Sequence, residues 1–327
     1  MAKFLKVMNK RLTAGSGFVL VAVLWLIMLL SIMAMGLSYS SRQSVRSMSA
    51  LVGGTQARYL AQGGVQLALA NLLNTEAGER LLGDNESVVL ELPHGEVELS
   101  VIDESGKIDI NVAGAELLAR LFVSVEVSEE DAEALADAVL DYRDEDDLPG
   151  VHGAEDKQYQ SADLPWESKD SAFTNVDEMQ RVYGMERWIY QAIVPHLTIY
   201  SRSKGVNPEV ASLQILQALS DDSLSALESY VDQRRENHLE GLAMPESPLI
   251  ERQFVSRSRG ETFTISASGR TPSGQRSAIT TTVRLKRGEN QETIEILNWQ
   301  PYRLSPPDSF VSGESPSLYG KANPEPR

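Results

Sequence analysis

One apolar run near the N-terminus constrains this chain more than any other feature. Residues 18–37 read FVLVAVLWLIMLLSIMAMGL, and no charged residue occurs between Arg11 and Arg42. A helix of twenty residues is about 30 Å long, which matches the hydrocarbon core of a bilayer. The residues before the run include four basic ones and no acid: Lys3, Lys6, Lys10 and Arg11. Basic flanks stay in the cytoplasm, so we expect a single-pass protein whose start is cytoplasmic and whose remainder crosses the membrane.

Three kinds of segment could begin this way. A cleaved signal peptide has a shorter apolar region of about 7–15 residues, and its best cleavage site here, Ala34-Met35-Gly36, lies at the far end of the run. A plain membrane anchor fits the run but leaves Gly15-Ser16-Gly17 without meaning. The segment most closely resembles a type IV prepilin leader, which is short and basic and ends in Gly. That resemblance implies cleavage between Gly17 and Phe18 by a prepilin peptidase and N-methylation of Phe18.

The fifth position after this junction departs from the usual prepilin pattern. Most pilins and pseudopilins have Glu there, whereas this chain has Ala22. Either the chain is no pilin, or it belongs to the one pseudopilin class that typically lacks this Glu.

The sequence beyond the apolar run predicts an α+β fold. Residues 88–92 and 96–101 alternate polar and apolar side chains about a Pro-His-Gly turn, and residues 262–267, 278–286 and 293–297 are also strand-like. Helical periodicity dominates residues 111–249 between these strand sets. This order predicts a helical domain inserted into a β-containing domain.

The insert contains a weak internal repeat. The segment that begins Asp109-Ile110-Asn111 recurs 98 residues later from Asn207, and Arg143 aligns with Arg234 at a shift of 91. Each copy is expected to form a helical hairpin, and Ser128 is a predicted N-cap.

Composition excludes several function classes. The chain has 327 residues, 30 Lys and Arg against 46 Asp and Glu, a formal net charge of −16 and no Cys. An acidic chain is poorly suited to bind nucleic acid, and without Cys there is no disulfide or thiolate site. No hydrolase, zincin or P-loop motif is present, so we expect no enzyme.

Taken together, these features resemble the K-type minor pseudopilins of the bacterial type II secretion system. The matching segments are GKIDINVA from Gly106, DYRDEDD from Asp141, GAEDKQY from Gly153, and FTNVDEM from Phe173 with Val182-Tyr183-Gly184. The resemblance implies a pilin-like fold, with a long N-terminal transmembrane α-helix packed on an antiparallel β-sheet and a large inserted α-helical domain containing the two hairpin repeats. The expected segments are a leader (1–17), the membrane part of the helix (18–37), the periplasmic helix and first strands (38–110), the insert (111–249), the last strands (250–299) and a disordered tail (300–327).

An acidic stretch in the insert is the candidate metal site. Asp144, Asp146, Glu155 and Asp156 are closely spaced oxygen ligands on a Gly-rich loop, as Ca²⁺ requires. Their spacing does not match an EF-hand, and such acidic runs are usually solvated surface. The family resemblance implies structural Ca²⁺ in this insert.

The expected function is that of a minor pseudopilin at the tip of the periplasmic pseudopilus, supporting export of folded proteins. The resemblance implies I- and J-type minor pseudopilins, the major pseudopilin and the inner-membrane assembly platform as partners. The alternative is an enzyme or ligand-binding protein of the periplasm on a plain membrane anchor.

Overall fold

The computed structural model describes residues 16–73, 80–257, 260–287 and 292–301. The chain separates into two compact units, residues 1–56 and 57–327. The leader prediction falls almost entirely outside the described residues, and so does the tail prediction apart from its first two residues.

A single long helix, α1 (Ser16–Leu72), contains the apolar run. Its part from Phe18 onward is the one candidate membrane span among the described residues, and the side chains of the apolar run are exposed. The pairs Gly53-Gly54 and Gly63-Gly64 lie inside this helix.

Five antiparallel strands form the main sheet of the second unit, in the order β1-β2-β5-β6-β7. This sheet and the long helix confirm the predicted α+β class, and every predicted strand segment lies within one of the five strands. The strands are β1 (Asp84–Leu92), β2 (Gly95–Asp103), β5 (Thr262–Arg270), β6 (Arg276–Arg287) and β7 (Glu292–Pro301).

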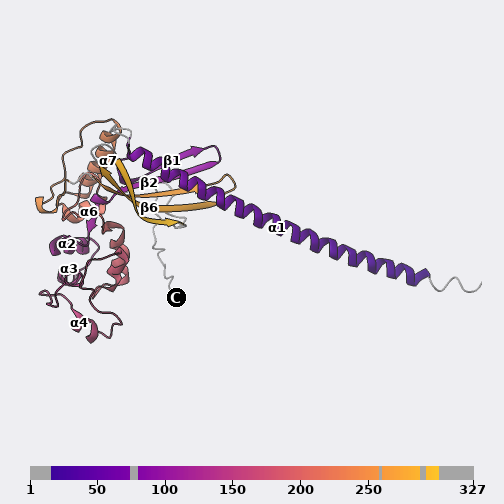
Figure 1. The fold of residues 1–327 in the computed structure, drawn as a ribbon, viewed down its shortest axis with the longest axis horizontal. Helices are drawn as coiled ribbons and strands as arrows, with labels where there is room; N and C mark the ends of the chain where they lie inside the picture. Colours follow the sequence, from indigo (N-terminus) through magenta and orange to yellow (C-terminus); the bar gives the residue numbers. More distant parts are fainter. Residues whose placement is uncertain (1–15, 74–79, 258–259, 288–291, 302–327) are drawn as a thin grey trace, which may run out of the picture. The chain divides into compact units, whose positions relative to one another are not determined.

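The last turns of α1 pack against one face of this sheet (Figure 1). Alternate side chains of β2, β5 and β6, such as Val97, Ile265 and Val283, form a core with Leu60, Val65 and other α1 residues. Glycine permits the close approach at Gly64, because a Cβ there would lie 2.5 Å from Val97 Cγ1.

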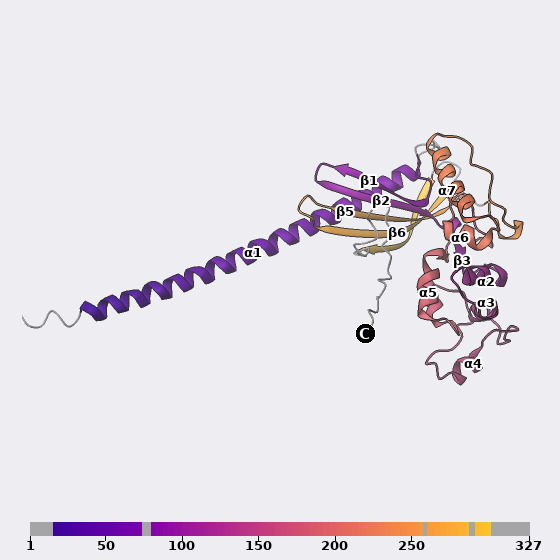
Figure 2. The same cartoon turned by 180° about the vertical axis from the view of Figure 1, so that it is seen from behind.

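The helical insert occupies the connection between β2 and β5. These strands pair continuously from Glu96–Arg270 to Asp103–Phe263, so the chain leaves and re-enters the sheet on neighbouring strands. The insert has its own hydrophobic core. Figure 2 labels its helices α2 to α7 and the short strand β3. In chain order, the elements of the insert are η2 (Glu104–Gly106), β3 (Ile108–Asp109), α2 (Ala115–Ser124), α3 (Glu129–Arg143), α4 (Asp156–Ser161), η3 (Val176–Arg181), α5 (Arg187–Ile193), η4 (Val194–His196), β4 (Leu197–Thr198), α6 (Leu213–Leu219), α7 (Leu224–Leu239) and η5 (Arg252–Phe254).

The predicted repeat is a structural one. The Asp109 carboxylate accepts a hydrogen bond from the Asn111 amide (2.9 Å), and the Asn207 side chain accepts one from the Glu209 amide (3.1 Å). Each turn leads into a helical pair, α2–α3 or α6–α7. Ser128 caps α3 as predicted, accepting from the Asp131 amide, and α7 has the same kind of N-cap in Ser223.

The two aligned arginines make the same contact in each copy. Arg143 donates hydrogen bonds to the Ile110 carbonyl and, at 2.7 Å, to the Ala113 carbonyl. Arg234 donates to the Pro208 carbonyl at 2.9 Å, and Pro208 occupies the position of Ile110 in the second copy. Each arginine therefore ties the second helix of its hairpin to the turn that precedes the first.

Candidate functional sites

The residues predicted for processing lie at the start of α1. Gly17 and Phe18 are in its first turn, and Ala22 follows one turn later. Phe18 is exposed, and Ala22 is exposed as well. Their proposed roles in processing and assembly stay predictions.

The acidic loop between α3 and α4 is organised around Asp141, in the last turn of α3. Its carboxylate is almost fully buried and accepts hydrogen bonds from the Gly150 amide at 3.2 and 3.0 Å. A Cβ at Gly153 would lie 1.8 Å from Asp141 Oδ2, so only glycine leaves room for this carboxylate. The Gly-rich part of the loop thus wraps around one buried acid.

Further carboxylates surround Asp141. Glu155 is the N-cap of α4, is 5% exposed, and forms a reciprocal capping box with Gln158. One buried oxygen on each of three side chains has no hydrogen-bond partner: Asp144 Oδ1, Glu155 Oε1 and Asp170 Oδ1. Such orphaned acceptors are costly unless a cation or a solvent molecule satisfies them.

The electrostatics of this cluster follow from its burial and its like charges. Burial is the main cause that raises the pKa of Glu155 to about 7, and the charges of Asp141, Asp170, Asp144 and Asp147 add to it. The pKa values of Asp141 and Asp144 are raised for the same two reasons, burial first. The cluster therefore favours a bound proton or a bound cation.

Three of the four predicted ligands lie near Asp141. Asp144 and Glu155 are in the cluster, and the charge of Asp146 contributes to the raised pKa values of Asp141 and Asp144. The Asp146 side chain is exposed, and its carboxylate accepts from the Leu148 amide (3.0 Å). The Asp156 carboxylate accepts from the Ser168 amide (3.1 Å) and so connects the start of α4 to the segment that follows this helix. Within the part of the chain that the structure describes, no three acidic or imidazole side chains already stand in a closed metal shell.

Two members of the cluster, Asp141 and Asp170, were not predicted. Asp141 is visible in the sequence only through the glycines that face it, Gly150 and Gly153. Asp170 lies 26 residues beyond Asp144 and belongs to no motif.

Comparison with known proteins shows what the chain is similar to. Residues 97–202 match the family model described as type II secretion system protein K. The type II secretion system protein K of Pseudomonas aeruginosa is 25% identical over 241 residues, covering 67% of this chain and 72% of that protein. Over these stretches the chain is similar to the type II secretion system protein K family.

Other members of the protein K family match over shorter stretches. The Dickeya chrysanthemi protein is 29% identical over 126 residues, covering 37% of this chain and 34% of that protein. The putative Escherichia coli K12 protein is 28% identical over 85 residues, covering 26% of each. The chain therefore spans, in alignment, about a quarter to a third of these two relatives.

A solved structure supports the fold. The crystal structure of the GspK-GspI-GspJ complex from the enterotoxigenic Escherichia coli type 2 secretion system contains a chain that matches with a TM-score of 0.50. The match covers 80% of this chain and 98% of that one at 17% identity, and so bears on the fold alone.

Proposed function

We propose that this chain acts as a minor pseudopilin of the type II secretion system, at the tip of the periplasmic pseudopilus, and supports export of folded proteins across the outer membrane. Similarity to type II secretion system protein K, in the family model and in the Pseudomonas aeruginosa relative, carries this proposal. The pilin architecture supports it, because α1 combines an apolar span with a periplasmic end that packs on a sheet. A membrane-anchored enzyme or ligand-binding protein has no comparable support.

Maturation is the first part of the proposal. A prepilin peptidase would cut after Gly17 and leave an N-methylated Phe18, with the N-terminus cytoplasmic, α1 in the inner membrane and the second unit in the periplasm. The mass of the membrane-extracted chain tests this directly. A start at Phe18 supports the proposal, whereas an intact Met1, or a start near Leu37, contradicts it. Replacing Gly17 with Leu should leave the leader attached, while Gly36→Leu, inside the apolar run and away from the junction, should be processed normally.

The tip position is the second part. A buried, unpaired carboxylate in an apolar helix bundle is costly, so the usual Glu is favourable only where it neutralises the terminal amine of a subunit ahead. Ala22 suits a subunit with no neighbour ahead. The large insert also suits the end of a filament better than its shaft. Partners would be the I- and J-type minor pseudopilins, with the major pseudopilin and the assembly platform below them.

Crosslinking tests the tip position. Crosslinks from the insert should reach other minor pseudopilins, and Ala22→Glu should not make this chain polymerise along the shaft. Abundant head-to-tail crosslinks between copies of this chain would contradict the tip position, but would leave the maturation proposal standing.

Structural Ca²⁺ in the insert is a separate proposal. The buried oxygens of Asp144, Glu155 and Asp170, with Asp141 beside them, form a donor set of the hard oxygen type that Ca²⁺ prefers. Bound Ca²⁺ would neutralise these acids and fix the loop, while Asp146 and Asp156 remain candidates from the sequence. The orphaned acceptors support this proposal, and small shifts of the side chains would be needed to close the shell.

Thermal unfolding of the detergent-solubilised chain tests the metal proposal. Unfolding temperature should rise in Ca²⁺ relative to chelator, because a ligand that binds only the folded state stabilises it. Glu155→Gln and Asp170→Asn should remove the increase, whereas Glu145→Gln, an exposed acid of the same loop, should retain it. Gly153→Ala should also remove it by displacing the Asp141 carboxylate, while Gly114→Ala, where a Cβ meets nothing within 4 Å, should not. An unchanged unfolding temperature for the unmodified chain would refute the metal site.

A further inference from the structure

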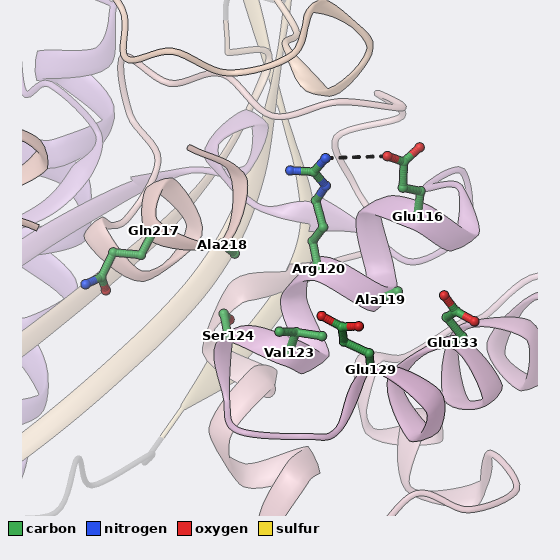
Figure 3. A pocket seen from close by; sticks show the side chains of 9 residues that line it. All are labelled: Glu116, Ala119, Arg120, Val123, Ser124, Glu129, Glu133, Gln217 and Ala218. Atoms are coloured by element: carbon green, nitrogen blue, oxygen red, sulfur yellow. Dashed lines mark ion pairs between the residues drawn. The ribbon is translucent and has the colours of Figure 1, made fainter. Parts of the chain in front are cut away.

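A groove runs along the outer side of α2, where α2 meets α6 and the start of α3. We call it the α2–α6 groove, and its volume is about 340 Å³. Figure 3 shows Gln217 and Ala218 of α6 on one side of it, and Glu129 and Glu133 of α3 on the other. The groove thus lies where the first helices of the two repeat copies come together.

The floor of the α2–α6 groove is apolar. Ala119 and Val123 stand one turn apart on α2, and Ala218 faces them from α6. Val123 is 42% exposed, while the other large apolar side chains of α2 are buried: Leu117, Leu118, Leu121 and Phe122. The small side chains of this floor leave room for a larger apolar side chain to enter from outside.

Among the described residues that line the groove, the one cation is already neutralised. Arg120 forms ion pairs with Glu116 (3.5 Å) and with Glu251, which is the N-cap residue of η5. The Arg120 guanidinium also lies 4.8 Å from the centre of the Phe254 ring. Gln253 donates further hydrogen bonds to both of these glutamates, at 3.2 and 2.9 Å. Arg120 is therefore held against the protein and is not available to an incoming group.

The acidic wall has no such compensation. Glu129 and Glu133 are exposed, stand one turn apart at the start of α3, and form no ion pair in the part of the chain that the structure describes. The groove therefore combines an apolar floor with two unneutralised carboxylates on one side. A complementary surface would present an apolar side chain beside positive charge.

We infer that the α2–α6 groove is a docking site for a segment of another protein that carries a Leu, Val or similar side chain flanked by Lys or Arg. The apolar side chain would occupy the floor between Val123 and Ala218, and the cations would pair with Glu129 and Glu133. The inference does not depend on the position of the chain in a filament, since it follows from the shape and charge of the groove.

Site-specific photocrosslinking of the full chain in membranes tests the inference. A photoreactive residue placed at Val123 or at Ala218 should form an adduct whose crosslinked peptide, read by mass spectrometry, contains Lys or Arg within one helical turn of the attachment point. The double variant Glu129→Lys/Glu133→Lys should reduce this adduct by about tenfold or more, because attraction becomes repulsion. The matched variant Glu228→Lys/Asp232→Lys, on exposed positions one turn apart on α7, should leave it unchanged.

Charge exchange completes the test. Changing the identified Lys or Arg to Glu should restore the adduct in the Glu129→Lys/Glu133→Lys chain. Four outcomes would each overturn the inference. The adducts could form only with a segment that lacks basic residues, or only with the same chain or a second copy of it. Alternatively, no protein adduct could form, or the two double variants could lose the adduct equally. An unfolding temperature matching that of the unmodified chain confirms that each variant is folded.

Discussion

Asp84 of β1 and Arg234 of α7 form an ion pair at 3.2 Å in which both side chains are 1% exposed. Arg235 adds a second bond to the same carboxylate oxygen at 2.7 Å. The pair joins residues 150 positions apart and connects the second repeat of the insert to the edge strand of the sheet. Arg234 thus has two tasks, since it also holds its own hairpin through the Pro208 carbonyl.

Removing Asp84 should be strongly destabilising. Asp84→Ala leaves the buried Arg234 cation without a counter-ion, which typically costs about 3–5 kcal/mol of unfolding free energy. Chemical denaturation followed by circular dichroism measures this loss. Glu91→Ala, an exposed acid on the same strand, should change stability by less than about 0.5 kcal/mol. Similar losses in the two variants would show that the pair contributes little.

Replacing Arg143 even with lysine should lower the stability of the folded chain. Its guanidinium reaches two carbonyls, those of Ile110 and Ala113, and a single ammonium group cannot reproduce that bridge. We expect Arg143→Lys to cost about 1–3 kcal/mol. Arg187→Lys, at an exposed position of α5, serves as the control and should be nearly neutral. Equal unfolding midpoints for the two variants would contradict the bridging role.

Two adjacent glycines of α1 should respond in opposite directions to the same substitution. A Cβ at Gly63 would meet nothing within 4 Å, so Gly63→Ala should stabilise the helix by about 0.5–1 kcal/mol. Gly64→Ala should destabilise the chain, because its Cβ would lie 2.5 Å from Val97 Cγ1 and 3.2 Å from Ala267 Cβ. Unfolding midpoints of the two variants provide the comparison, and a shift of the same sign in both would contradict the close packing.

Stability in the absence of Ca²⁺ should fall as pH rises from about 4 to 7. Burial is the main cause that raises the pKa of Glu155 from 4.5 to about 7 and that of Asp103 from 3.8 to about 6. Across this window the folded state binds more protons than the unfolded state, so raising the pH favours unfolding. Glu155→Gln should make the dependence of unfolding temperature on pH shallower when measured in chelator. Glu145→Gln should leave its slope unchanged, and identical slopes for both variants would refute the assignment to Glu155.

Features that depend on neighbouring residues could be predicted from the sequence. Alternation identified the strands, and a serine before an acidic helix start identified the Ser128 cap. The repeat was visible because Asp109 and Asn207 begin similar segments, and each serves the same turn. In these cases the physical cause lies within a few residues along the chain.

Features that depend on distant residues could not be predicted. Nothing around Asp84 indicates that its partner is Arg234, because pairing across the fold leaves no periodic signal. Asp170 joins the acidic cluster for the same reason, through the path of the loop. The candidate metal ligands were therefore chosen by spacing, whereas the burial of an acid depends on which side chains the loop turns inward.

The placement of the insert between two paired strands has a consequence for the order of folding. If the insert were unfolded, β2 and β5 could pair only by closing a loop of about 160 residues, with a length-dependent entropic cost of roughly 4–5 kcal/mol. A folded insert brings its own ends together, through the Asn207 amide on the Ser105 carbonyl and the Val206 amide on the Phe254 carbonyl, each at 2.8 Å. The remaining gap is then only a few residues long. The insert should therefore fold first and serve as the template on which the central strands of the sheet meet.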